Sequence, residues 1–407
     1  MMPRFVEVAI IGAGPYGLSL AAHLSHAGVS FRIFGKPLST WRHHMPKGMH
    51  LNSDGFASNI SSPDASTTLK AWCEKNGVAY GDQAAPVELE TFNAYASWFQ
   101  KHAVPSLEEL NVTSLSRYNE RYTLVLENGE RVEARHVVLA VGITWFAHLP
   151  EALRGLNSAC VTHSFAHHDL SQFKGKDVIV LGAGASAIDT AALAEDAGAK
   201  VSILARADHI RFHSAPDPDD ASFLKQLQRP STGIGPGWRS FFCANTPLLF
   251  HRMPENLRLR ATKNHLGPAP GWFMRERVEG KIPVLLGHAL KNARAYDKRV
   301  TLDVVDALGK EKLLSCDHVI AATGYKPDLT RLPFLEPFLR SAILQVEHTP
   351  VLSDHFETSA DGLYVIGPAA ANAFGPLMRF MVGAEFVAPR LTGHLRRKIG
   401  SRFAKAA

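Results

Sequence analysis

The chain has 407 residues, of which 46% are hydrophobic and 20% are charged, and its formal net charge is +6. This balance is typical of a globular protein, and the length exceeds what one ordinary core supports, so we expect two domains. No apolar run reaches the roughly 18–20 residues that span a bilayer, and the N-terminus lacks a basic leader, so we expect a soluble, cytoplasmic protein without a membrane anchor.

The N-terminal segment has the pattern of a strand, a glycine-rich turn and a helix. Residues 5–11 form a near-continuous apolar run, as in a buried parallel strand, and Gly12-Ala-Gly-Pro-Tyr-Gly17 follows it. A helical stretch, 18–27, ends at a glycine, and a second strand covers 30–34. In such a βαβ unit the first glycine makes a tight turn, the second lets the backbone approach a pyrophosphate, and the third packs helix on strand. The segment therefore predicts a dinucleotide site.

A helix and a β-rich stretch come next along the chain. Residues 92–103 have the periodicity of an amphipathic helix, and residues 122–133 alternate apolar and polar side chains like a meander. A strand over 136–142 then ends in glycine. The same succession of meander and glycine-ended strand recurs at 299–314 and 318–324. We therefore expect each half of the chain to contain a β-meander that is followed by a parallel strand ending in glycine.

A second segment repeats the plan of the first. Strand 177–181 leads into Gly182-Ala-Gly-Ala-Ser-Ala187, a helix and a strand over 200–204. Ala187 is an accepted variant at the third glycine position. Arg206 follows the second strand, where an acidic residue would bind a ribose 2′-hydroxyl and an arginine would pair with a 2′-phosphate. The sequence thus favours NADP(H) over NAD(H), with a surface arginine as the alternative. In the first unit Gly35 stands at this position.

The remaining pattern indicates how the two units are connected. Residues 207–280 are rich in Pro, Gly, Trp and Phe and predict irregular helices and loops, whereas a strand at 362–367 precedes a last helix. The order is explained if a second dinucleotide-binding domain, 160–320, is inserted into a first that comprises 1–159 and 321–407. The predicted fold class is α/β, with two Rossmann-like dinucleotide-binding domains.

Cysteine, histidine and basic residues predict no further site. The four cysteines are too far apart for a CxxC pair, so we expect reduced structural thiols and neither a redox pair nor zinc. His163, His167 and His168 share no spacing with a cysteine or carboxylate, so we expect no metal. Basic residues are scattered apart from the run 394–398, which has the pattern of a solvated helix end, so we expect no nucleic-acid partner.

These motifs together resemble the two-dinucleotide-binding flavoproteins, and among them the class B flavin monooxygenases of the flavin-containing, Baeyer–Villiger and N-hydroxylating types. The stretch Trp41–Leu51 is similar to a tryptophan-containing segment along the flavin, and Asp317-His-Val-Ile-Ala-Ala-Thr-Gly-Tyr325 resembles the D…ATGY signature of N-hydroxylating enzymes. The lack of a cysteine pair argues against the disulfide reductases. Two departures are that the FxGxxxH pattern keeps only His163, and that Pro368 stands where many flavoproteins have Asp.

The resemblance implies FAD at the first glycine loop and NADPH at the second. The implied reaction is a monooxygenation through a C4a-hydroperoxyflavin, with O2 and a small amine or other soft nucleophile as substrates. The implied FAD-binding residues are Gly12, Gly14, Pro15, Gly17, Trp41, Arg42, Leu51, Val112, Gly142, Gly367, Gly375 and Pro376. The implied NADP-binding residues are Gly182, Gly184, Ser186, Arg206, Thr323, Gly324 and Tyr325.

Several alternatives remain open at this point. Asn52 matches an asparagine that stabilises oxygen intermediates in flavin-containing monooxygenases, and a loop-capping asparagine is the alternative. Tyr325 could instead pack at a domain hinge, and Gly375 with Pro376 could simply start a helix. The competing functions are an FAD-dependent NAD(P)H reductase that passes electrons to another acceptor, and a nucleotide-sensing or scaffold protein. A homo-oligomer is also left open.

Overall fold

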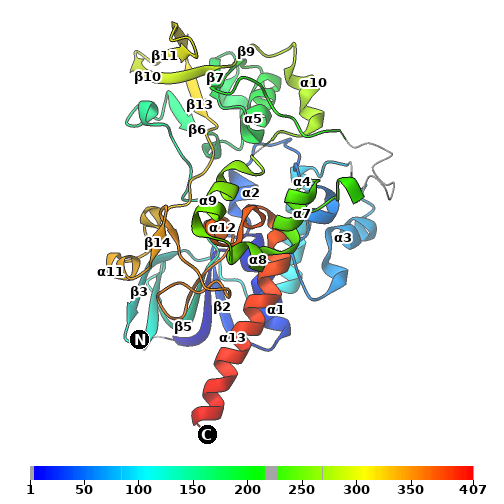
Figure 1. The fold of residues 1–407 in the computed structure, drawn as a ribbon, viewed down its shortest axis with the longest axis vertical. Helices are drawn as coiled ribbons and strands as arrows, with labels where there is room; N and C mark the ends of the chain where they lie inside the picture. Colours follow the sequence, from blue (N-terminus) through cyan, green and yellow to red (C-terminus); the bar gives the residue numbers. More distant parts are fainter. Residues whose placement is uncertain (1–3, 84, 216–226, 268, 407) are drawn as a thin grey trace.

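The computed structural model describes residues 4–83, 85–215, 227–267 and 269–406. The two sheets that carry the glycine loops lie in separate halves of the molecule, and Figure 1 shows the second sheet with α5 and α10 above the first sheet with α1 and α13. The helices are α1 Pro15–His26, α2 Ser39–His43, α3 Leu69–Asn76, α4 Leu89–Ala103, α5 Ala185–Asp196, α7 Trp238–Asn245, α8 Pro247–His251, α9 Glu255–Asn264, α10 Arg275–Val278, α11 Pro337–Ser341, α12 Ala371–Phe374 and α13 Ala384–Ala406. The strands are β1 Arg4–Ile11, β2 Phe31–Phe34, β3 Val112–Tyr118, β4 Arg121–Leu126, β5 Arg131–Leu139, β6 Val161–His163, β7 Asp177–Leu181, β8 Lys200–Leu204, β9 Val284–Leu285, β10 His288–Tyr296, β11 Arg299–Asp306, β12 Glu311–Cys316, β13 His318–Ala321, β14 Gln345–Val346, β15 Thr349–Pro350 and β16 Leu363–Val365.

The first sheet brings the carboxyl ends of its parallel strands to one edge. Its order is β2-β1-β5-β4-β3, and β16 also pairs with β5. In register, Ile11 lies beside Phe34 and Leu139, and Val365 lies beside Leu139. The first glycine loop therefore leaves the sheet where β2, β5 and β16 also end. This is the edge at which open α/β sheets bind their ligands.

The meander of the first half differs from the expectation in one respect. The sequence pattern separates a meander at 122–133 from a strand at 136–142, whereas β5 is one strand that pairs antiparallel with β4 and parallel with β1. In the second half the chain is broken as expected, because β12 ends at Cys316 and β13 begins at His318. Helix α1 also begins three residues before the predicted 18–27, because Pro15 is favourable in the first helical turn.

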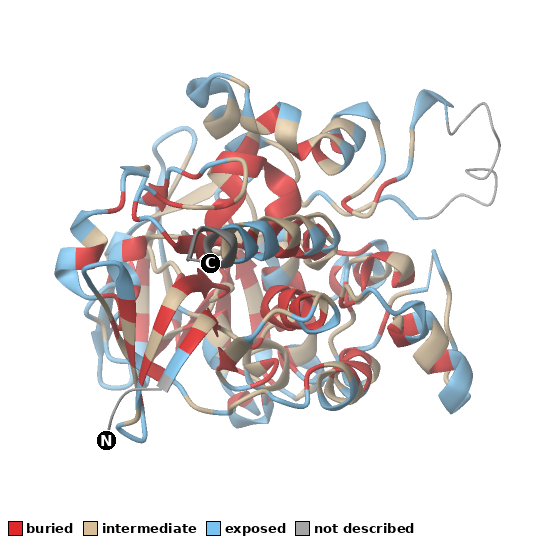
Figure 2. Ribbon diagram, turned by 90° about the horizontal axis from the view of Figure 1, so that it is seen from below, coloured by how far each residue is buried: buried red, intermediate tan, exposed pale blue. Residues whose placement is uncertain are grey.

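The second sheet repeats the edge arrangement. Its order is β6-β13-β7-β8-β9, with all neighbours parallel. Leu181 at the end of β7 lies beside Leu204 and Ala321, so the second glycine loop again leaves the sheet among strand ends. The antiparallel strands β10, β11 and β12 form a separate sheet. Figure 2 shows that buried residues gather along the strands and central helices, and exposed ones on the outer loops.

Part of the irregular stretch 207–280 packs on the first sheet's core. Ile234, Cys243 and Phe250 belong to the same buried cluster as β1 and α1, whereas Met274 and Val278 belong to the cluster around β7 and α5. Helices α7–α9 thus extend the first core, and the chain returns to the second core at α10. Among the described residues, no helix combines the length and apolar character needed to cross a bilayer.

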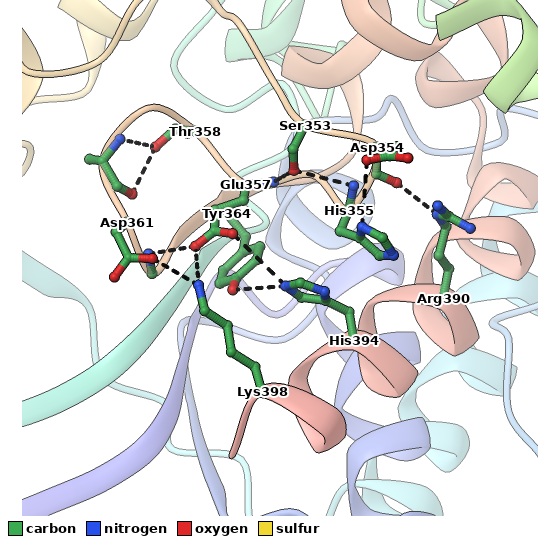
Figure 3. A network of polar contacts seen from close by, with 12 residues as sticks. Ser353, Asp354, His355, Glu357, Thr358, Asp361, Tyr364, Arg390, His394 and Lys398 are labelled. Carbon is green, nitrogen blue, oxygen red and sulfur yellow. Dashed lines mark hydrogen bonds and ion pairs between the residues drawn. The ribbon is translucent and has the colours of Figure 1, made fainter. Parts of the chain in front are cut away.

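The C-terminal helix corrects one reading of the sequence, because the basic run at 394–398 is only partly solvated. Lys398 Nζ donates to Glu357 Oε1 at 2.5 Å and to Asp361 Oδ1 at 2.8 Å, and the His394 ring lies 3.3 Å from the Tyr364 hydroxyl. Figure 3 shows these side chains pointing from α13 toward the loop before β16. A charge run is visible in sequence, but its distant carboxylate partners are not.

Candidate functional site

The first glycine loop has the space that a pyrophosphate needs. Gly12 has φ +117°, and a methyl group there would overlap the Ala140 carbonyl oxygen, as one at Gly17 would overlap that of Gly12. At Gly14, which precedes α1 in extended conformation, a methyl group would meet no atom of the described residues within 4 Å. Pro15 then begins the helix. Two glycines are therefore required by packing, and Gly14 opens the helix N-terminus to an anion.

Tyr16 connects this loop to the turn that follows α12. It lies within the glycine motif, is 8% exposed, and its hydroxyl lies 2.8 Å from the Phe380 carbonyl oxygen and 3.1 Å from that of Met378. Burial raises the pKa of this phenol, so it acts as a hydrogen-bond donor. The glycine spacing gave no signal for Tyr16, because its partners lie more than 300 residues away.

Gly375 and Pro376, which were expected to bind FAD at this turn, have no free N–H to offer a ligand. Gly375 has φ +89°, and its N–H already donates to the Ala371 carbonyl at 2.8 Å, while Pro376 has no N–H. Leu377 is therefore the first residue of the turn that can offer an N–H outward. Phe250 from α8 packs on Gly375, where a methyl group would lie 3.2 Å from its ring. The turn is thus shaped by the irregular stretch as well as by its own residues.

The remaining residues expected at FAD have different surroundings. The Trp41 ring packs on Phe92 at 4.8 Å between centroids, and Arg42 donates to Ser97 Oγ at 2.6 Å. Leu51 is 3% exposed, so its side chain belongs to the core. The remaining three are Val112 at the start of β3, Gly142 with φ +60° after β5, and Gly367 with φ +80° beside the Tyr16 ring.

An acidic residue of another segment, Glu108, does have its backbone beside Gly35. The Gly35 N–H donates to the Glu108 carbonyl at 3.1 Å. The Glu108 carboxylate accepts two bonds from Arg32, at 2.7 and 2.6 Å, and Arg32 also binds Glu130 at 2.9 Å. Sequence reasoning looked for an acid at the end of β2 and missed this one, because only the pairing of residue 34 with residue 108 brings it there.

The second glycine loop has the same geometry as the first. Gly182 has φ +144°, its N–H donates to the Leu204 carbonyl at 2.9 Å, and a methyl group there would lie 2.5 Å from the Ala322 oxygen. Gly184 precedes α5 in extended conformation, with φ −88° and ψ 179°. Arg206 is exposed just beyond β8. This arrangement fits a pyrophosphate at the start of α5 and a 2′-phosphate near Arg206.

A cleft lies between the two units. It is lined from the expected first domain by His44, Met45, Pro46, Met49 and Tyr325, and from the expected inserted domain by Ser164, Ser186, Asp189 and Thr190. The structure thus brings together two predicted residues, Ser186 and Tyr325. The other two residues of the β13 turn lie beside residue 148, since the Thr323 hydroxyl donates to the His148 carbonyl and the His148 N–H donates to Gly324 at 2.9 Å.

Residues 163–168 hold the two sides of the cleft together. The His44 ring stacks on Phe165 at 3.9 Å and donates to its carbonyl at 2.8 Å, and His168 donates to the Met45 carbonyl at 2.6 Å. At the other end His163 Nε2 donates to the Gly324 carbonyl at 3.1 Å. These histidines therefore act as hydrogen-bond donors at the boundary.

Asp189 is a buried acid on the cleft wall that the sequence analysis did not single out. It lies in α5, one turn after Ser186, and is 3% exposed. Burial raises the pKa of Asp189 to about 7, against a smaller opposing effect of Arg277. A carboxyl with this pKa can hold or release a proton near neutral pH. Its sequence context is an ordinary helix, and only burial distinguishes it.

No cysteine lines the described part of the cleft. All four cysteines (Cys73, Cys160, Cys243 and Cys316) are buried and free. In the described ranges no group of three or more His, Cys, Asp or Glu side chains has the geometry to hold a metal ion. The cleft therefore offers carboxyl, hydroxyl, imidazole and thioether groups.

Comparison with known proteins places this geometry in a family. A family model described as pyridine nucleotide-disulphide oxidoreductase matches residues 9–229, which is more than half of the chain. The chain belongs to this family. The expected fold with Rossmann-type domains, the expected flavoprotein superfamily and the expectation of an oxidoreductase are thereby confirmed.

The proteins that are similar to this chain have different activities in their names. The chain is 32% identical to a ferredoxin–NADP reductase of Gluconacetobacter diazotrophicus over 66% of its own length and 62% of the relative's. It spans about three fifths of the length of the first curated relatives it matches. The ornithine hydroxylase of Pseudomonas aeruginosa has a TM-score of 0.74 at 16% identity, covering 97% of this chain and 100% of that one. The bacillithiol disulfide reductase of Staphylococcus aureus has a TM-score of 0.64 at 19% identity, covering 97% and 99%. At these identities the structures show the fold alone.

Proposed function

We propose that the protein is an FAD-dependent, NADPH-consuming monooxygenase that hydroxylates a small amine or oxygenates another soft nucleophile. For an amine the balanced reaction is RNH2 + O2 + NADPH + H+ → RNHOH + NADP+ + H2O. The observation that carries the proposal is the composition of the cleft between the segment 44–49 and the second glycine loop. Its described lining contains no cysteine, and the four cysteines of the chain are buried singly elsewhere. A family member without a dithiol needs another final electron acceptor, and O2 meets that need.

Each glycine loop fits one dinucleotide. Gly14 and the start of α1 would hold the FAD pyrophosphate, and Leu377 would offer an N–H to the flavin ring. Gly184 would hold the pyrophosphate of NADPH, and Arg206 would hold its 2′-phosphate. When bound, FAD supplies the redox chemistry, since it accepts a hydride and delivers electrons to oxygen.

The chain's own side chains would contribute proton handling and exclusion of water. Asp189 can hold a proton at neutral pH on the cleft wall. The contacts of residues 163–168 keep the wall closed on one side. Asn52 is exposed beside the cleft-lining segment that ends at Met49, so its amide can donate to an oxygen atom. The proposal includes these residue roles. It also includes domain boundaries near residues 160 and 320.

A second candidate is a reductase that passes electrons to a protein acceptor. It is favoured by the names of the sequence relatives, among which ferredoxin–NADP reductases recur. In that case Asn52 and the cleft would have no oxygen chemistry to support. The two candidates differ in which molecule finally accepts the electrons of NADPH, and in whether an oxygen atom of O2 enters the product.

Isotopically labelled oxygen separates these candidates. FAD-loaded protein is first reduced with NADPH without air, and labelled O2 is then admitted with a panel of amines. A monooxygenase gives one labelled oxygen atom in the product for each NADPH consumed. Rapid NADPH oxidation with hydrogen peroxide as the sole product, whatever amine is present, together with reduction of ferredoxin when it is added, would overturn the proposal in favour of the reductase.

A further inference from the structure

A short strap between α9 and α10, residues 270–273, reaches from the second unit to Asn52. It is held at both ends. The buried Pro270 carbonyl accepts from the His213 N–H at 2.9 Å, and the N–H of Met274, 2% exposed in the second core, donates to the Gly271 carbonyl at 3.0 Å. The strap therefore has a defined position rather than that of a free loop.

Gly271 is required by space and not by backbone conformation. Its φ of −61° and ψ of 146° are open to any residue. A methyl group on Gly271 would nevertheless lie 2.8 Å from Asn52 Oδ1 and would overlap the ring of Phe273. Any side chain here must displace the Asn52 amide or the aromatic ring, so Gly271 sets the position of the amide.

Aromatic rings line the strap beside Asn52. The Phe273 ring lies 5.6 Å from the His50 ring and 5.9 Å, edge to face, from the Trp272 ring. Phe273 is partly buried against the second core, whereas Trp272 is 37% exposed. Burial lowers the pKa of the neighbouring His213, and the charge of Asp54 opposes this shift. Burial thus disfavours the charged form of His213, and the wall beside Asn52 is mainly aromatic.

We propose that this strap is the substrate-side wall of the site and that it selects amines with an aryl or bulky apolar group. The proposal rests on the monooxygenase function and adds the substrate class. An aryl group can pack edge to face on Phe273, while Gly271 leaves the Asn52 amide free to meet the reacting nitrogen. Contacts of this kind correspond to about 2- to 12-fold in affinity. An amine with a short linear chain gains no such contact.

The test measures binding to the FAD-loaded protein separately from turnover. Benzylamine and n-butylamine are titrated against the oxidised holoenzyme, with the flavin absorbance as the signal, and kcat and KM are then measured for each. The variants are Phe273→Leu, which keeps an apolar side chain, and Gly271→Ala. The matched control is Gly267→Ala, since Gly267 is exposed in the same stretch and a methyl group there meets no described atom within 4 Å.

Wild type is expected to bind benzylamine more tightly than n-butylamine, and Phe273→Leu to lose that preference. Gly271→Ala should weaken both amines about 10-fold or more with unchanged flavin content, and Gly267→Ala should match wild type. The inference is overturned if wild type has no preference, if neither amine binds, or if Phe273→Leu retains the preference. Tight benzylamine binding without oxygenation would instead refute the proposed function and leave the strap's role standing.

Discussion

Substitution of Gly14 by alanine separates ligand binding from folding at the first glycine loop. The backbone at Gly14 is extended, with φ −83°, and a methyl group would enter open space. The free energy of unfolding of the apoprotein should therefore change by less than about 1 kcal/mol. The methyl group would instead occupy the space of a bound phosphate. An overpacking cost of about 1–3 kcal/mol corresponds to a rise in the Kd for FAD of about 5- to 150-fold.

Gly12→Ala serves as the contrasting variant. Its φ of +117° and the overlap with the Ala140 carbonyl predict a loss of folding stability on the order of 1–3 kcal/mol or more, whatever ligand is present. The assay is urea denaturation of both apoproteins, followed by FAD titration with flavin fluorescence. If Gly14→Ala binds FAD like wild type, no phosphate approaches this residue and the reasoning is refuted. If Gly14→Ala loses as much folding stability as Gly12→Ala, the inference that a methyl group fits at Gly14 is refuted.

Three further predictions concern the second glycine loop, the histidines of residues 163–168, and Tyr16. Arg206→Ala should raise KM for NADPH about 10-fold or more, because a charge-assisted bond of about 1.5–3 kcal/mol is lost, and should leave KM for NADH nearly unchanged; equal effects in steady-state kinetics would exclude a 2′-phosphate contact. Burial lowers the pKa of His163 and of His167 to about 4, so the unfolded chain, with a histidine pKa of about 6.5, takes up protons before the native protein does. The stability from these two residues is complete above pH 6.5 and is lost as the pH falls toward 4. Urea denaturation at several pH values should therefore show a free energy of unfolding that falls with falling pH, and His167→Gln should make this dependence weaker. An unchanged pH dependence in the variant would contradict this assignment. Tyr16→Phe removes the bond to the Phe380 carbonyl and should cost about 1 kcal/mol in thermal or urea unfolding while weakening FAD binding; full FAD affinity with reduced stability would restrict Tyr16 to a structural role.

Local patterns in the sequence were sufficient for the two βαβ units. Strands β7 and β8 were predicted with the bounds that the structure has, because each is a short, mostly apolar segment next to the glycine-loop helix, and Gly182 ends the first of them. The left-handed backbone of Gly12 and Gly182 follows from their place in the motif, since only glycine adopts it without strain. These features depend on a few consecutive residues and can be read in sequence order.

Tertiary structure alone decided what surrounds the loops. Asp189 has an elevated pKa because the cleft buries it, and Gly271 matters because Asn52 lies against it from more than 200 positions earlier in the chain. The same holds for Glu108 beside Gly35, and for Lys398, which the charge pattern placed in solvent. Helical and strand periodicity reports which face of an element is buried, but not which distant segment covers it. Space, burial and ion pairing at the candidate site therefore arise only when the chain has folded.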